Sequence, residues 1–177
     1  MKNFIISFIC VAIIISVGVY TYDVKNIKAS ASLNSSSTKP NKELSSKQIP
    51  NPMKEYSTLD EARKAAGFNF VIPTVLPDGY QMNGIKVING SMAEVTYKKG
   101  DLKIIYRTVA GNSDISGDYN AYDVVKTITA GNTKVVIKGK SDGINLATWT
   151  KEGVSFSLSF AEAVNEKAVS TMVESIK

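Results

Sequence analysis

Histidine is absent from the 177 residues of this chain, and cysteine and tryptophan each occur only once. Without histidine there can be no Ser-His-Asp or Cys-His catalytic group, and no imidazole ligands of the kind that most catalytic zinc sites use. The single cysteine, Cys10, cannot form a disulfide within the chain, so any folded domain must be stable through packing alone. The sequence also lacks a glycine-rich phosphate-binding pattern. We therefore expect a protein that is not an enzyme, with no catalytic, cofactor-binding or metal-binding residues.

Concentrated positive charge is scarce outside the first 50 residues, although the formal net charge is +5. Residues 1–50 hold six lysines and two acidic residues, a net charge of +4, whereas residues 51–177 hold 15 basic and 14 acidic residues, a net charge of +1. Nucleic-acid binding depends on many cationic contacts to phosphates, so the nearly neutral second part predicts no nucleic-acid partner. Positive charge beside an apolar run suits an anionic membrane surface or a wall polymer, or it keeps a linker soluble.

The most informative segment is a run of 19 uncharged and mostly apolar residues from Phe4 to Tyr22. As a helix it would span roughly 28 Å, close to the thickness of the hydrocarbon core of a bilayer. The run is longer than the apolar stretch of a cleaved signal, and a cleavage motif ending at Ala31 lies well beyond it. We expect residues 4–22 to be a single-pass anchor in the cell membrane, with the carboxyl-terminal domain outside. The alternative is a secreted form, cleaved near Ala31.

Composition divides the chain into three parts. Residues 1–22 form the membrane anchor or signal segment, and residues 23–52 form a flexible linker rich in serine, lysine and asparagine. The linker has too few large apolar side chains to offset the entropy of ordering it. Residues 53–177 have the usual size of one domain and can bury a core, so we expect one extracytoplasmic α+β domain there.

Two helices are predicted, one near each end of this domain. Ser57 is placed to cap a helix that runs to Ala66, and Gly67 is placed to end it. The second helix is predicted over residues 165–176. Its apolar side chains recur at the spacing of one helical face, at Val169, Met172, Val173 and Ile176.

Between the helices, apolar and polar residues alternate with the period of β-strands, most regularly from Val154 to Phe160. Asn89-Gly90 is a strong hairpin signal, and Gly100 and Gly131 mark two further turns. Strands with one apolar face are typical of an antiparallel sheet that is covered on one side. We therefore predict an α+β fold in which an antiparallel sheet of about six or seven strands is packed on one face by an N-terminal and a C-terminal helix, preceded by one transmembrane helix.

The polar stretch over residues 112–123 is the main candidate for binding. We interpret it as a solvated connection between strands and a partner-binding loop, whose candidate residues are Asp114, Asp118, Tyr119, Asn120 and Tyr122. Its alternating oxygen-bearing side chains also resemble a calcium loop. However, Tyr119 stands where an EF-hand needs glycine, and Val125 stands where it needs a bidentate glutamate. Trp149 lies in a predicted strand, and we interpret it as a core residue rather than a binding aromatic.

Four segments, in this order, resemble the family known as domain of unknown function 4367: Leu76-Pro77-Asp78-Gly79-Tyr80, Val95-Thr96-Tyr97, Leu146-Ala147-Thr148-Trp149, and Val169 to Ile176. The resemblance covers most of residues 57–177. It implies an extracytoplasmic module of Gram-positive bacteria, often carried behind one transmembrane helix and sometimes attached to anti-sigma-like regulators. The family offers no catalytic residues, and only a few residues precede the apolar run, too few for a cytoplasmic sigma-binding domain.

Three functions fit these observations. The first is a membrane-tethered, non-enzymatic module that binds a protein, lipid or cell-wall partner outside the cell. The second is a structural accessory subunit of an envelope or spore assembly. The third is a carboxylate-dependent hydrolase, although the acidic residues fall at turns, helix caps and solvent-facing positions, where solubility and turn chemistry explain them.

Overall fold

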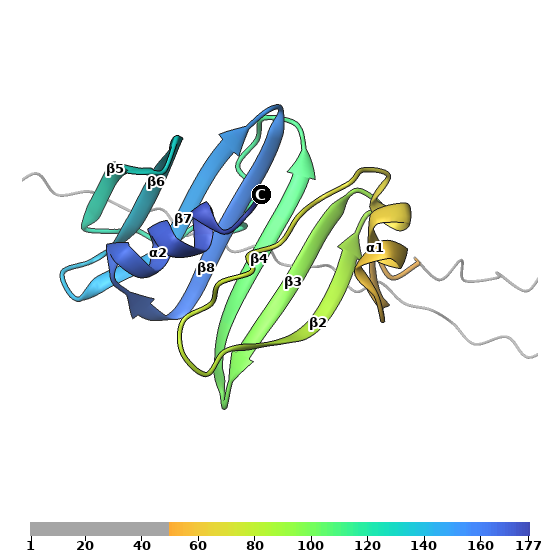
Figure 1. Cartoon of the computed structure of the whole chain (residues 1–177), viewed down its shortest axis with the longest axis horizontal. Helices are drawn as coiled ribbons and strands as arrows, with labels where there is room; N and C mark the ends of the chain where they lie inside the picture. Colours follow the sequence, from red (N-terminus) through yellow and green to blue (C-terminus); the bar gives the residue numbers. More distant parts are fainter. Residues whose placement is uncertain (1–49) are drawn as a thin grey trace, which may run out of the picture. The chain divides into compact units, whose positions relative to one another are not determined.

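The computed structural model describes residues 50–177, which form one antiparallel sheet of eight strands and two helices (Figure 1). The elements follow one another as β1 (Met53–Tyr56), α1 (Leu59–Ala66), β2 (Gln81–Ile88), β3 (Met92–Lys99), β4 (Leu102–Ala110), β5 (Val124–Ala130), β6 (Thr133–Lys140), β7 (Gly143–Lys151), β8 (Val154–Val164) and α2 (Glu166–Glu174). The predicted α+β class, with a large antiparallel sheet and two helices, is confirmed.

The strand order across the sheet is β1-β2-β3-β4-β8-β7-β6-β5, and every neighbouring pair is antiparallel. Strands β1 to β4 and strands β5 to β8 are thus two meanders that join where β4 pairs with β8, for example at Tyr106 and Leu158. The chain leaves β4 in the middle of the sheet and must reach β5 at its far edge. Residues 111–123, which we call the crossover loop, make this connection.

The sheet has one strand more than the upper limit of the prediction. The additional strand is β1, which pairs with β2 through Met53 opposite Ile88 and Tyr56 opposite Ile85. Three of its four residues are exposed, so it shows no alternation of apolar and polar side chains. Pairing with the edge of β2, rather than a pattern of its own, makes this segment a strand.

The helix ends follow local capping chemistry. Thr58, and not the predicted Ser57, caps α1, because the Thr58 hydroxyl accepts from the Glu61 N–H at 3.2 Å while the Glu61 carboxylate accepts from the Thr58 N–H at 3.2 Å. Gly67 ends this helix in the left-handed region, at φ 76°. Asn165 caps α2, and the helix ends at Glu174, two residues before the predicted Ile176.

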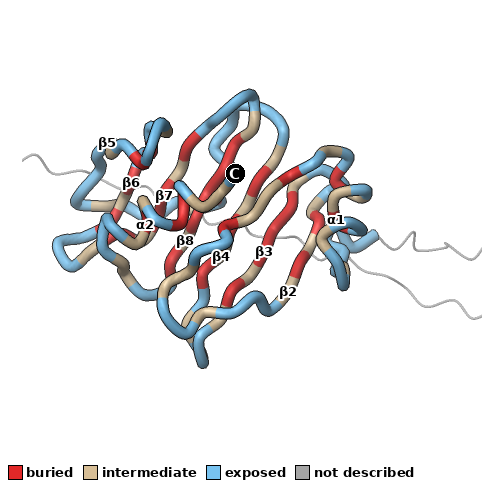
Figure 2. Tube along the Cα trace, in the orientation of Figure 1, coloured by how far each residue is buried: buried red, intermediate tan, exposed pale blue. Residues whose placement is uncertain are grey.

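One face of the sheet is covered and carries the core. Figure 1 shows α2 and the segment 67–80 crossing in front of the strands, and Figure 2 shows the buried positions running along the strands beneath them. Ala62 and Ala66 of α1 and Val169, Met172 and Val173 of α2 join the same core cluster. The predicted packing of both helices on the apolar face is therefore correct.

The segment 67–80 completes this cover, which the sequence pattern did not indicate. The Tyr106 hydroxyl donates to the Val71 carbonyl at 2.7 Å, and the backbone N–H groups of Thr74 and Val75 donate to the Ser175 hydroxyl at 3.1 and 3.2 Å. These contacts join the segment to the sheet and to the end of α2.

The predicted membrane helix over residues 4–22 lies outside the described residues, as does the predicted linker except for residues 50–52. Across residues 50–177, neither helix has the length and apolar character needed to cross a bilayer.

Candidate functional site

The crossover loop lies on the face of the sheet opposite the helices. Its first turn is fixed to β8, because the Ser113 N–H donates to the Ser155 hydroxyl at 3.0 Å and that hydroxyl donates to the Gly111 carbonyl at 2.9 Å. Ser155 neighbours the core residue Phe156 along β8, and successive side chains of a strand point to opposite faces. The loop therefore covers the second face of the sheet beside β8.

Leu146 of β7 is a buried apolar residue on this second face of the sheet. It is fully buried at 0% exposure but does not belong to the core cluster, whereas its neighbour Ala147 does. Leu146 pairs with Ser159, so it faces the side away from α2. The crossover loop lies beside it, because Asn120 and Tyr122 line one cavity together with Ser159, the pairing partner of Leu146.

Hydrogen bonds within the loop use both predicted aspartates. Asp114 Oδ1 accepts from the Ser116 N–H at 2.9 Å and from the Ser116 hydroxyl at 2.7 Å. The hydrogen bond from the Ser116 backbone is the main reason that the pKa of Asp114 lies below its usual value, and the Ser116 hydroxyl adds to it. The ionised form of Asp114 thus holds the first half of the loop in its turn.

Asp118 performs the same role in the second half. Its Oδ1 accepts from the Asn120 N–H at 2.8 Å, and its Oδ2 accepts from the Tyr122 hydroxyl at 2.6 Å. Burial raises the pKa of Asp118, but these hydrogen bonds outweigh it and the pKa is lowered. Burial, followed by the hydrogen bond to Asp118, raises the pKa of Tyr122. The structure therefore brings three predicted site residues together, Asp118, Asn120 and Tyr122, while Asp114 pairs with Ser116.

The side chain of Tyr119, the fifth predicted residue, forms no hydrogen bond with these groups and is 98% exposed. Beside it lies an open cavity of about 420 Å³, here called the Tyr119 groove, which is lined by Ile88, Met92, Arg107, Asp114, Ile115, Ser116, Gly117, Asp118 and Tyr119. Ile88, Met92 and Ile115 give this groove an apolar surface. Sequence reasoning missed these three residues, and the only signal was that Ile88 and Met92 flank the predicted Asn89-Gly90 turn.

Arg107 fixes the loop to the sheet. Its Nε donates to Oε2 of Glu94 at 2.8 Å, and its Nη1 donates to the Ser116 carbonyl. Gly117, at φ 62°, passes so close that an added Cβ would lie 2.8 Å from Arg107 Nη1. Glycine is needed here both for its backbone conformation and for the close approach of the guanidinium.

The contacts of the crossover loop bear on its resemblance to a calcium loop. In the part of the chain that the structure describes, no three acidic or cysteine side chains are grouped as metal ligands. Oδ1 of Asp114 and both carboxylate oxygens of Asp118, which an ion would coordinate, instead accept hydrogen bonds from their own loop. These hydrogen bonds are suited to holding the crossover loop in one conformation.

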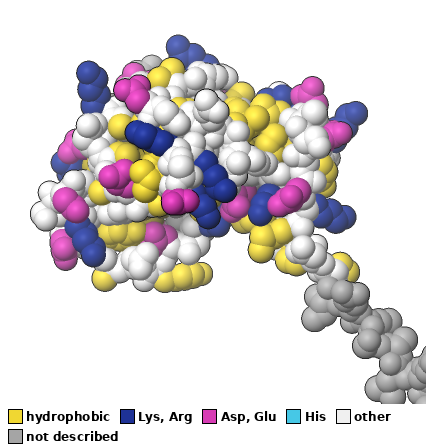
Figure 3. Space-filling view, turned by 90° about the horizontal axis from the view of Figure 1, so that it is seen from below, with side chains coloured by type: hydrophobic (Ala, Val, Ile, Leu, Met, Phe, Trp, Pro, Cys, Tyr) yellow, Lys and Arg dark blue, Asp and Glu magenta, His cyan; other side chains and the backbone are white. Residues whose placement is uncertain are grey.

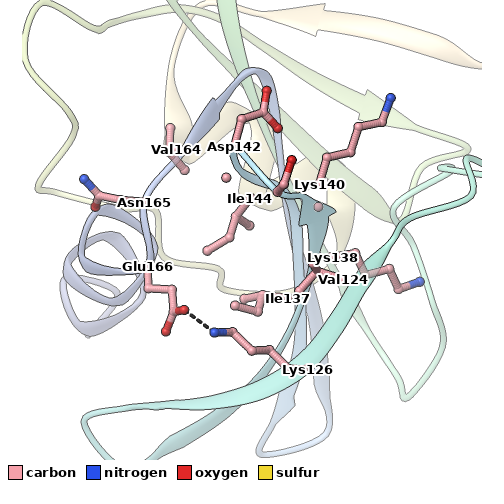
Figure 4. A pocket seen from close by; sticks show the side chains of 13 residues that line it. Val124, Lys126, Ile137, Lys138, Lys140, Asp142, Ile144, Val164, Asn165 and Glu166 are labelled. Carbon is pink, nitrogen blue, oxygen red and sulfur yellow. Dashed lines mark hydrogen bonds and ion pairs between the residues drawn. The ribbon is translucent and has the colours of Figure 1, made fainter.

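A second cavity, of about 360 Å³, lies at the start of α2 between the ends of β5, β6, β7 and β8 (Figure 4). Ile137, Ile144 and Val164 contribute apolar surface to it, and the Lys126–Glu166 ion pair lies at its margin. None of the predicted site residues lies here. No signal in the sequence pointed to this cavity, because its lining comes from three separate stretches of the chain, around residues 124–126, 137–144 and 164–166.

No curated protein and no solved structure matches this chain. A family model does match it, over residues 71–176, and its description is a domain of unknown function (DUF4367). The match begins after α1, so it is shorter at its start than the resemblance over residues 57–177. It contains the four segments that carried that resemblance, strands β2 to β8, the crossover loop and α2. The chain therefore belongs to this family of domains of unknown function.

Proposed function

We propose that this protein is a non-enzymatic binding module, tethered to the membrane by residues 4–22 with its domain outside the cell, and that it binds a protein, lipid or cell-wall partner. Among these partners the geometry favours a protein. The observation that supports it is Tyr119, a large aromatic side chain that is 98% exposed on a loop that Asp114 and Asp118 hold with hydrogen bonds.

Preorganisation is the physical reason for this choice. Ordering a loop during binding costs free energy, and a loop that is already held by Asp114, Asp118 and Arg107 avoids most of that cost. Tyrosine is enriched among the residues that dominate protein interfaces, because it buries a large area with few rotatable bonds. The apolar Tyr119 groove beside it can accept a partner side chain.

Crosslinking in intact cells tests this proposal. A photoreactive amino acid is placed at position 119 of the full chain, and as a control at Val75, which is also exposed but lies in the segment that covers the other face. We expect one discrete adduct at position 119, lost when Met92→Asp disrupts the groove. Equal labelling at both positions, or none at position 119, would count against the proposal.

Localisation is tested separately, by the intact mass of the mature chain and by an enzyme reporter fused to its carboxyl end. An uncleaved chain whose reporter is active outside the cell supports the tethered module. A mass that corresponds to a chain beginning near Ser32 supports the secreted alternative, and a reporter active only inside the cell contradicts both.

A structural accessory subunit is the second candidate, and the edge of β5 favours it. Within residues 50–177, β5 ends the sheet with one side unpaired, it has seven residues and no proline, and its Val125 is 59% exposed. Such an edge can accept a further strand from another chain. Thr127→Pro would remove this capacity, and native sizing of the detergent-extracted complex would show whether a larger assembly is lost.

A further inference from the structure

A second groove lies on the same open face, over β1 to β4, and it is lined by lysines. Its volume is about 550 Å³, and its lining residues are Glu55, Tyr56, Asn83, Gly84, Ile85, Lys86, Glu94, Thr96, Lys98, Lys103 and Ile105. We call it the lysine groove. No residue of the crossover loop lines it, so in this part of the sheet the face opposite the helices is open.

The two acidic side chains of the groove are already paired. Glu94 forms its ion pair with Arg107 at 2.8 Å, and Glu55 forms one with Lys86 at 3.3 Å. Lys98 and Lys103 form no ion pair with any residue between 50 and 177. They are directly opposite each other on β3 and β4, an arrangement in which like charges repel and destabilise a sheet.

We propose that the lysine groove binds an anionic polymer in which polyol units, rather than nucleosides, are joined by phosphodiester groups. Lys98 and Lys103 would bind one phosphate between them, where an anion replaces their mutual repulsion with attraction. The hydroxyl of Thr96 and the amide of Asn83, which also line the groove, can donate hydrogen bonds to phosphate oxygens. This site goes beyond the proposed protein contact at Tyr119 and does not depend on it.

The register of the strands explains why an extended ligand fits better than a single ion. Lys86 is opposite Glu94, and Lys98 lies four residues further along β3, about 13–14 Å away. The Lys86–Glu55 pair is exposed and therefore contributes little stability, so Lys86 can turn toward a second phosphate. A chain of phosphates reaches both positions, and a lone phosphate reaches only one.

The shape of the site favours a polymer over a membrane surface as its ligand. The lysines line a groove on the open face of the sheet, and a groove suits an extended chain better than it suits a flat bilayer surface. Gly84 lies in the middle of the groove opposite Thr96, and a Cβ added there meets no atom within 4 Å. The centre of the groove is therefore empty space in which an extended chain can lie. Figure 3 shows charged side chains of both signs interspersed over one side of the domain, so binding must depend on this local arrangement rather than on net charge.

Calorimetric titration of the full chain in a neutral detergent tests the proposal, with a short poly(glycerol phosphate) as the probe. We expect Lys98→Gln combined with Lys103→Gln to weaken binding at least tenfold, and to reduce the dependence of binding on salt. The matched control is Lys134→Gln combined with Lys151→Gln, which removes the same charge elsewhere and should leave binding unchanged. Equal weakening in the two double variants would overturn the proposal.

Three further measurements distinguish loss of the site from loss of the fold, and a polymer from a lipid as the ligand. Without ligand, the Lys98/Lys103 double variant should unfold at a higher temperature than the parent chain, because the repulsion is removed. Gly84→Glu should abolish binding while Gly84→Ala retains it. The polymer should protect Lys98 and Lys103 from acetylation, and inorganic phosphate should protect them far less. Protection by phosphatidylglycerol micelles but not by the polymer would overturn the choice of ligand.

Discussion

Arg107 and Glu94 lie directly opposite each other on β4 and β3, and they form an ion pair of 2.8 Å in which the side chains are only 23% and 11% exposed. The same guanidinium donates to the Ser116 carbonyl of the crossover loop. One side chain thus joins two strands of the sheet to the loop that carries Tyr119. Arg107 also separates the Tyr119 groove from the lysine groove, since it lines the first and its partner Glu94 lines the second.

Arg107→Lys should destabilise the domain and release the crossover loop. A lysine keeps the charge but cannot donate in two directions with the planar geometry of a guanidinium. Loss of a hydrogen bond to a charged group typically costs about 1.5–3 kcal/mol of the free energy of unfolding. Urea unfolding measures this cost. Amide exchange at Ser116 and Asn120 should accelerate more than exchange in β6.

Glu94→Gln is the control for this prediction. It retains an acceptor for Arg107 and removes only the charge, so we expect a smaller loss of stability than for Arg107→Lys and unchanged exchange in the loop. If Glu94→Gln loosens the loop as much as Arg107→Lys does, the loop is held by the charge of the pair and not by the second hydrogen bond of the guanidinium.

The order of the crossover loop should depend on pH through Asp114. Because hydrogen bonds from Ser116 lower its pKa in the folded chain, ionised Asp114 contributes stability above its unfolded pKa of about 3.9. This contribution is lost as the pH falls through the lower, folded value. We expect the exchange-corrected protection of the Ser116 N–H to decrease below about pH 4. In Asp114→Asn the protection should be low throughout, without that pH dependence.

Trp149→Ala should cost about 3–5 kcal/mol of stability, the usual cost of removing a large aromatic side chain from a core. Trp149 is 7% exposed and stacks on Phe156, with ring centroids 5.2 Å apart and planes 7° apart. Its predicted place in the core is confirmed. Tyr119→Ala is the matched control and should change stability by less than about 0.5 kcal/mol, because its ring contacts solvent. Similar unfolding midpoints for the two variants would contradict this assignment.

The sequence predicted the elements whose signals are local. The period of two from Val154 to Phe160 indicated β8, the spacing of Val169 and Met172 indicated α2, and Asn89-Gly90 indicated the turn between β2 and β3, where both residues have positive φ. Alternation of apolar and polar residues also predicted which face carries the helices. Each of these signals spans fewer than a dozen residues and depends on chemistry that the segment itself contains.

The features that the sequence could not predict depend on contacts between distant segments. Strand β1 forms because β2 offers it an edge, and the segment 67–80 is held by Ser175, about a hundred residues away. At the candidate site, the five loop residues were chosen for their chemistry, but the apolar groove beside Tyr119 needed the β2–β3 turn to be placed against it. The opposition of Lys98 and Lys103 was likewise invisible until the strand register was known.

Gly139 offers a prediction that only the structure provides, since this glycine lies inside β6 and not at a turn. A Cβ added there would lie 2.0 Å from the Gly143 carbonyl oxygen, at the point where the register of β6 and β7 shifts. Gly139→Ala must therefore move backbone atoms, and overpacking of this kind typically costs about 1–3 kcal/mol or more. Gly84→Ala, also within a strand but with open space around the added methyl, should unfold close to the parent chain. Thermal unfolding of the two variants measures the difference. Equal midpoints would show that the β6–β7 hairpin can relax around the methyl group, and that its close backbone approach is not what requires glycine.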